Sequence, residues 1–223
     1  DERIVATGDV DAFLPDGSRM RGPSAEYYRA IPGQRPVTRL YASGRPTITL
    51  VQVDSSRITA DSIARTDSSR GVTDTVARTD TLVVIANQVL MLGDSLVYAG
   101  GSVIATRPEV EARGDSMVVD SEAERLVIMR NPSILGRGER PFTLSGERIE
   151  LTSTERQLSR VLSMGGARAT SDDLTLLADT IDLRMEDDLL QRAIAWGTSR
   201  ARANSATQRL VADSIDVRMP DQR

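Results

Sequence analysis

An acidic or amide residue recurs inside one short phrase of this chain, and carboxylates are the only abundant side chains that could carry acid–base chemistry. The last two copies read Ala178-Asp-Thr-Ile181 and Ala212-Asp-Ser-Ile215. Two carboxylates that flank a glycosidic bond can hydrolyse it. With 32 acidic residues, however, close pairs arise by chance, so this spacing does not indicate an enzyme. The central residues of the phrase are Asp61, Asn87, Asp115, Glu147, Asp179 and Asp213.

Other catalytic groups are scarce. The chain has no histidine and no cysteine, which removes the usual general base, the commonest metal ligand, disulfides and thiolate chemistry. It contains no nucleophile elbow, no phosphate loop and no metal-ligand spacing. We therefore expect no enzyme activity, no catalytic residues, no cofactor and no metal. A parallel β-helix of the polysaccharide-lyase type is the best enzymatic rival, but its coils are usually shorter and lack a recurrent charged hairpin turn.

The charge of the chain limits its partners. A net charge of −4 and a pI near 5.1 give no basis for general nucleic-acid binding, which requires a basic face. All 28 basic residues are arginine. This usage is explained either by a GC-rich genome or by selection for bidentate contacts with phosphate or carboxylate groups, which arginine makes and lysine does not.

The phrase recurs roughly every 26 to 34 residues, which is typical of one supersecondary unit copied along an axis. Apolar residues alternate with period two in 177–185 and again in 211–219, as in antiparallel strands with one covered side. A unit of about 32 residues must fold back into about three strands, the third led by glycine. These patterns predict an all-β chain with a single elongated domain over 1–223, and the polar segment 64–80 predicts a long exposed loop inserted into it.

This repeated pattern, in which the acid phrase leads into alternating strands, resembles the OstA-like family of Gram-negative lipopolysaccharide transport. The resemblance is greatest to its periplasmic bridge members of the LptA type. The resemblance covers about Arg3 to Met219. The phrases that carry it are Val83-Val-Ile-Ala-Asn-Gln-Val89, Asp94-Ser-Leu-Val-Tyr-Ala-Gly-Gly-Ser-Val103, Leu177-Ala-Asp-Thr-Ile181 and Leu210-Val-Ala-Asp-Ser-Ile215.

The resemblance implies an elongated open β-jelly roll of stacked antiparallel strands, with an apolar groove in which acyl chains lie. The in-phase apolar residues are either the lining of that groove or an ordinary sealed core. A one-faced sheet that is only half closed leaves a slot suited to hydrocarbon. The expected lining is Met117, Val119, Ile149, Leu151, Leu158, Leu162, Ile181, Leu183, Met185, Leu190, Ile194, Trp196, Ile215, Val217 and Met219.

The recurrent acids share the strand parity of this apolar row, which would turn charge inward. One explanation is that the small residue before each acid marks a bulge that flips the phase and exposes the acid. The other is a structural pair with arginine across a hairpin, Glu147 with Arg160 and Asp179 with Arg192.

The resemblance also implies function and partners. We expect a non-enzymatic bridge in the periplasm, its signal peptide removed or excluded, that carries lipopolysaccharide or a related glycolipid toward the outer membrane. Its edge strands would pair with other OstA-like domains, or head to tail with further copies, and the strand ending at Met219-Pro220 is the expected donor edge. The alternative is a structural or adhesive β-repeat protein without lipid cargo.

Overall fold

The computed structural model describes residues 3–52, 80–108, 110–137, 141–155, 157–186 and 189–219, and the regular structure in these ranges is entirely β-strand. The Asp61 phrase and nearly all of the 64–80 insertion lie outside the described residues. The strands are β1 (Arg3–Phe13), β2 (Arg19–Tyr28), β3 (Arg39–Ser43), β4 (Thr47–Gln52), β5 (Asp80–Ile85), β6 (Gln88–Leu92), β7 (Leu96–Thr106), β8 (Val110–Asp120), β9 (Arg125–Met129), β10 (Ser133–Gly136), β11 (Phe142–Ser145), β12 (Arg148–Thr154), β13 (Gln157–Thr170), β14 (Leu174–Glu186), β15 (Leu189–Ser205) and β16 (Arg209–Arg218).

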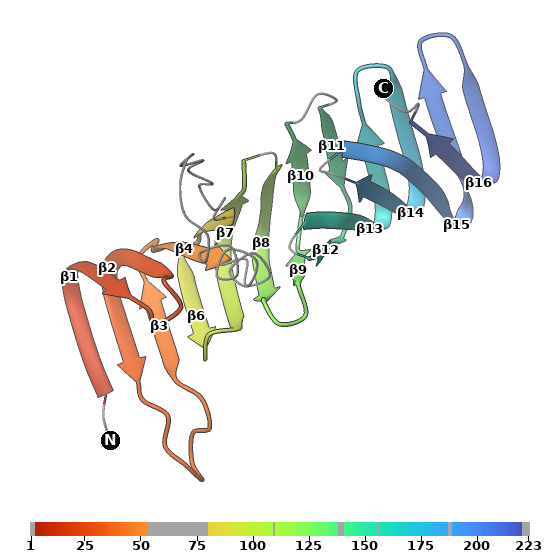
Figure 1. Cartoon of the computed structure of the whole chain (residues 1–223). Coiled ribbons are helices and arrows are strands. Elements are labelled where there is room, and N and C mark those ends of the chain that lie inside the picture. The colour runs from red at the N-terminus through yellow and green to blue at the C-terminus, as the bar shows by residue number, and fades with distance from the viewer. Residues whose placement is uncertain are drawn as a thin grey trace, which may run out of the picture.

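All the named strands belong to one antiparallel, hydrogen-bonded sheet, which confirms the predicted all-β class. They stack along one axis, from β1 at the N-terminal end to β16 at the other end (Figure 1). Among the described strands, β1 pairs only with β2 and β16 only with β15, so these two strands are the edges of the stack.

The sheet is folded lengthwise into two layers. Layer A contains the short strands β3, β6, β9 and β12, and layer B contains β4, β5, β10 and β11. The longer strands pass through both layers: β13, for example, pairs with β12 through residues 157–164 and with β11 through residues 168–170. We call the line of bends between the layers the corner, and the hairpin turns farthest from it the rims.

Bulges and glycines form the corner. The pairing register shifts between Met164 and Ala167 in β13 and between Leu177 and Thr180 in β14. Gly165 and Gly166 have φ values of 78° and 59°, a left-handed conformation that glycine adopts without steric cost. The expected short third strand after these glycines is therefore not separate here, because the bend leaves the hydrogen bonding of β13 continuous.

The inward faces of both layers form one apolar core cluster that includes residues from Met20 to Ile215. Strand alternation places every second residue in this cluster and the residues between them on the outside. In the described ranges there is no helix with the length and apolarity needed to cross a membrane.

Candidate functional site

The interior between the layers is the candidate site, and layer A supplies one side of it. Register pairing joins interior residues of successive strands into a continuous row. None of these residues is more than 5% exposed, and all except one are apolar. The row runs Ala42, Val89, Ala99, Met117, Ile128, Ile149, Ser163, Ile181, Ala195 and Ile215.

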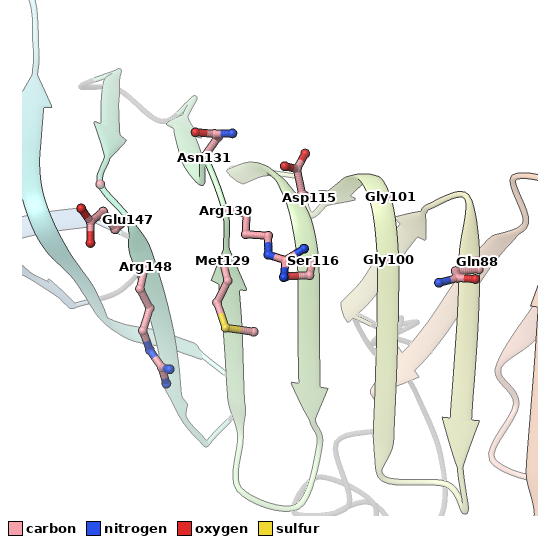
Figure 2. A pocket seen from close by; sticks show the side chains of 11 residues that line it. Gln88, Gly100, Gly101, Asp115, Ser116, Met129, Arg130, Asn131, Glu147 and Arg148 are labelled. Carbon is pink, nitrogen blue, oxygen red and sulfur yellow. The ribbon is translucent and has the colours of Figure 1, made fainter.

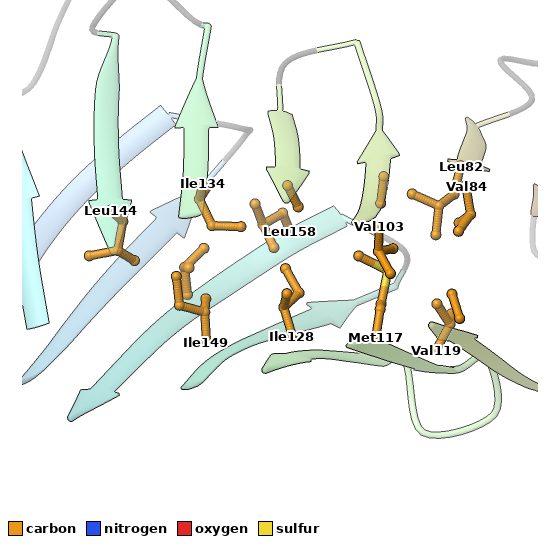
Figure 3. Packing of buried hydrophobic residues seen from close by; sticks show 14 of the residues in the cluster. Leu82, Val84, Val103, Met117, Val119, Ile128, Ile134, Leu144, Ile149 and Leu158 are labelled. Atoms are coloured by element: carbon orange, nitrogen blue, oxygen red, sulfur yellow. The ribbon is translucent and has the colours of Figure 1, made fainter. Parts of the chain in front are cut away.

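Layer B supplies a matching row on the opposite side. Ile134 and Leu144 point from this layer into the same space as Ile128 and Ile149 of layer A (Figure 3). Sequence reasoning missed this row for two reasons: β10 and β11 have only four residues each and show too little alternation to be recognised, and Ala105, Ala112, Ala169 and Ala203 in the longer strands are weak hydrophobic signals. Its members are Met20, Ile48, Val84, Ala105, Ala112, Ile134, Leu144, Ala169, Leu176, Ala203 and Leu210.

The exception among the interior residues of layer A is Ser163, which is fully buried. Its hydroxyl donates a hydrogen bond of 2.9 Å to the backbone carbonyl of Ser145. A buried hydroxyl costs free energy unless it is paired in this way. The interior therefore presents no unsatisfied hydroxyl at Ser163 and remains chemically apolar at this point.

The interior is filled by its own side chains near the corner. Toward the rims it becomes partly accessible in β12, β14, β15 and β16, whereas Met91, Val97 and Val119 near the rims of β6, β7 and β8 are buried. Met117, Ile149, Ile181 and Leu183 are at most 1% exposed. Four predicted lining residues nearer the rim of layer A are only partly buried, and each packs against the core: Leu151, Met185, Leu190 and Val217.

The predicted lining set thus divides. Met117, Val119, Ile149, Leu158, Ile181, Leu183 and Ile215 are buried in the interior, and the four rim residues join them there. Met219 follows β16, and its backbone N–H donates to the carbonyl of Gln191.

The prediction is wrong for Leu162, Ile194 and Trp196, which lie on the outer face of layer A and not in the interior. Leu162 lies opposite Asp182 in the register, and Asp182 lies opposite Ile194. Their neighbours Val161, Ala193 and Ala195 are the interior residues of the same strands. Alanine at 193 and 195 is a weak hydrophobic signal, so the larger outer residues Ile194 and Trp196 dominated the sequence pattern.

The outer face of layer A carries clusters in which one carboxylate binds two arginines. Asp182 is 2% exposed. Its carboxylate accepts hydrogen bonds of 2.8 and 3.0 Å from Arg160, and Arg184 lies 2.8 Å away. Glu150 is bound by Arg125 at 2.6 Å and Arg148 at 3.5 Å.

Asp216 forms the third such cluster, with Arg192 at 2.6 Å and Arg218 at 4.0 Å. The hydrogen bond from Arg192 is the main cause that holds the pKa of Asp216 below its ordinary value. The hydrogen bond from Arg125 likewise lowers the pKa of Glu150. All three acids occupy one register row, so the face is a regular ladder of ion pairs.

The recurrent acids lie at the corner, so the predicted pairs of Glu147 with Arg160 and Asp179 with Arg192 are wrong. Arg160 and Arg192 bind Asp182 and Asp216 instead. The bulge explanation holds, because the register shifts at the acid phrase turn these carboxylates outward.

Asp179 shows how the phrase works. Its carboxylate accepts hydrogen bonds from the Thr198 hydroxyl at 2.7 Å and from the backbone N–H groups of Thr198 and Ser199. These bonds, led by that of the Thr198 hydroxyl, lower the pKa of Asp179. Gly197 is required beside it, because a Cβ there would lie 2.4 Å from this carboxylate. Asp179 therefore satisfies backbone donors that the bend of β15 leaves open.

A shallow depression with a volume of about 1060 Å³ lies on the outer side of the corner in the middle of the chain. Figure 2 shows Arg130 running alongside Ser116, with Asp115 and Asn131 above. The lining residues are Gln88, Gly100, Gly101, Asp115, Ser116, Met129, Arg130, Asn131, Gly146, Glu147 and Arg148. In the described part of the chain, no group of three or more acidic residues is arranged to hold a metal ion.

Comparisons with known proteins give a structural likeness. No protein-family model matches the chain, and no curated protein matches it. A solved structure described as LptH, the LptA-homologous periplasmic component of the lipopolysaccharide transport device from Pseudomonas aeruginosa, is similar over 62% of this chain and 95% of that chain. The TM-score is 0.44 and the sequence identity is 15%.

Proposed function

We propose that this protein is a non-enzymatic periplasmic scaffold that carries lipopolysaccharide or a related glycolipid along its apolar interior toward the outer membrane. The observation that carries the proposal is the pair of facing rows, which stay apolar or small from strand to strand along the stack. Acyl chains bind by burying apolar surface, which is worth about 25 cal/mol per Å² and needs no directional contacts. The family resemblance of the repeated phrases supports the same cargo.

Cargo entry requires movement, because the interior near the corner is filled by side chains. The rims are the place for it: Met185 and Leu190 pack against the core but are only partly buried. The corner is held by bulges and by hydrogen bonds such as that from the Glu147 N–H to the Gly165 carbonyl, at 3.0 Å. An acyl chain would therefore spread the rims while the corner acts as the hinge.

The two ends of the stack have features that suit pairing of the edge strands with partner domains. Some interior side chains at the two ends are uncovered: Ile4 in β1 is 61% exposed and Leu210, the last residue of the layer B row, is 54% exposed. Ile215, the last residue of the layer A row, is by contrast 4% exposed. An edge strand offers unpaired backbone groups to another chain. A related domain or a second copy paired with β16 would continue both the sheet and the apolar rows.

Thiol protection tests the proposal directly, because the chain has no native cysteine. Leu190→Cys places a thiol at the interior rim, and Ile194→Cys places one on the outer face of the same strand. Adding lipopolysaccharide should slow maleimide labelling at position 190 several-fold and leave position 194 unchanged. Equal protection at both positions would indicate coating by micelles and refute interior binding.

The structural or adhesive alternative predicts that no lipid accompanies the protein. Native mass spectrometry of the protein purified without detergent should show a glycolipid adduct if the proposal holds. Only bare protein, together with unchanged labelling at position 190, would favour the alternative.

A further inference from the structure

We propose that the outer side of the corner holds a second binding site, for a saccharide chain. The site combines the depression around Arg130, shown in Figure 2, with the exposed tyrosines Tyr41 and Tyr98 on the same face of the sheet. It lies on the face of the sheet opposite the interior, so this inference goes beyond the proposed lipid function and does not depend on it.

Several charged side chains of the depression have no charged partner in the part of the chain that the structure describes, although Arg148 pairs with Glu150 and Gln88 accepts a hydrogen bond from Tyr41. Within the described ranges, no ion pair is recorded for Arg130, Asp115 or Glu147, although both aspartate and arginine find partners along the nearby ladder. Gln88, Ser116 and Asn131 add amide and hydroxyl groups that both donate and accept hydrogen bonds.

The backbone at Arg130 and Asn131 is strained, with φ values of 61° and 57°. In the next unit the corresponding corner has Gly165 and Gly166. The correspondence follows from the backbone bonds, since the Asp115 N–H donates to the Arg130 carbonyl and the Glu147 N–H donates to the Gly165 carbonyl, both at 3.0 Å. Glycine would relieve the strain at 130, so a side chain kept there indicates a use for that side chain.

The tyrosines supply an aromatic platform next to these polar groups. Tyr98 is 41% exposed and Tyr41 is 38% exposed. Both pair with Leu90 in the register, so they lie on one face, two strands or about 9.6 Å apart. The Tyr41 hydroxyl and the Gln88 Oε1 are joined by a hydrogen bond of 3.1 Å, which connects the platform to the depression.

The composition selects the ligand class. Arg148 is already paired with Glu150, which leaves Arg130 against Asp115 and Glu147, so the site has no net attraction for a polyanion. Gly100 and Ser116 are small and leave the floor open. Flat aromatic rings beside many groups that both donate and accept match a sugar ring, which has an apolar face and hydroxyls at its edge.

The test uses two lipid-free probes, maltoheptaose and the oligosaccharide released from lipopolysaccharide by mild acid. Ligand-observed NMR and calorimetry should show saturable binding of at least one probe to the full chain. Tyr98→Ala and Arg130→Gly should each weaken it at least tenfold. The control Arg168→Ala, on the outer face of layer B, should bind as the unaltered protein does.

Arg130→Gly separates binding from folding. Because glycine tolerates φ of 61°, this variant should unfold at a urea concentration equal to or above that of the parent, yet lose the saccharide. Absence of saturable binding of either probe to the parent would overturn the proposal. So would parental affinity in Arg130→Gly. Lipid protection at Leu190 tests the interior separately, so the two proposals can fail independently.

Discussion

The two faces of strand β14 differ in the contacts that their side chains make. Ile181 and Leu183 point into the interior, where each strand offers a similar apolar residue to the next. The alternate residues Asp182 and Arg184 point outward into a ladder of ion pairs. The interior rows would accept a strand shifted by two residues, because one apolar residue would replace another. The outer ladder would not, because each acid would lose its arginines, so we infer that the outer face fixes the register.

This division explains how a repeated β-sheet can present a continuous apolar interior without ambiguous pairing. The ion pairs of these strands lie on the outer face, and at the corner Asp179 satisfies bent backbone. The interior is then free to be uniform, as the proposed binding of a flexible hydrocarbon chain requires.

The largest difference in the free energy of unfolding is expected between alanine variants of two isoleucines on opposite faces. Ile181 is fully buried in the interior, and Ile194 is partly exposed on the outer face. Ile181→Ala should lower the free energy of unfolding by about 3 kcal/mol, because it leaves a cavity. Ile194→Ala should cost about 1 kcal/mol or less. Urea unfolding of both variants measures the difference, and equal losses would mean that the faces are not distinct.

The corner is tested by adjacent glycines that share a left-handed backbone. Gly166→Ala adds strain alone, since nothing lies within 4 Å of the new Cβ, and should cost about 1 kcal/mol. Gly165→Ala should cost about 2 kcal/mol, because its Cβ would also lie 2.8 Å from the Glu147 side chain. The same unfolding measurement applies. If Gly166→Ala is the more damaging, the close approach at the corner is wrong.

The ladder is tested at its most buried acid. Asp182→Asn keeps the shape but removes the charge shared by Arg160 and Arg184, and should cost about 2 kcal/mol. The control Asp213→Asn should change stability by less than about 0.5 kcal/mol, because the Asp213 side chain is 96% exposed. A loss for Asp182→Asn no larger than that of the control would show that the ladder does not stabilise the sheet.

Acid should weaken the ladder in a defined direction. The pKa values of Glu150 and Asp216 are lowered, first by hydrogen bonds from Arg125 and Arg192. Their stabilisation is therefore complete above the unfolded pKa values, about 4.3 and 3.9, and is lost as pH falls through the lower folded values. Urea midpoints should drop below about pH 4, and Glu150→Gln should flatten this dependence. Glu122→Gln, at an exposed turn, should not.

Strand alternation predicted the fold class and the layer A interior residues of β8, β12, β14 and β16, but no interior residue of β3, β6, β7 or β9. It failed where the outer residue is larger than the inner one, as at Ile194 between Ala193 and Ala195. Parity alone also could not decide the place of Asp179, since a bulge changes the phase without any marker beyond a small residue. The row of layer B was missed because Ile134 and Leu144 lie in strands too short to show a period.

For a related reason, the sequence alone could not predict which arginine pairs with which acid. Arg160 lies one residue beyond a register shift in β12–β13, between Thr152 and Ser153, so its cross-strand partner depends on a bulge at the hairpin end. Only the register in the folded sheet places Arg160 opposite Arg184 and beside Asp182.

Photo-crosslinking on the two faces of layer A distinguishes binding of the glycolipid in the interior from binding on the outer face. A benzophenone residue at Met185 or Val217 reports on the interior rim, and one at Leu162 or Ile194 reports on the outer face. With lipopolysaccharide present, we predict adducts at the two interior positions and at most a tenth as much at the two outer ones. Equal capture on both faces, or capture on the outer face alone, would refute binding of the glycolipid in the interior.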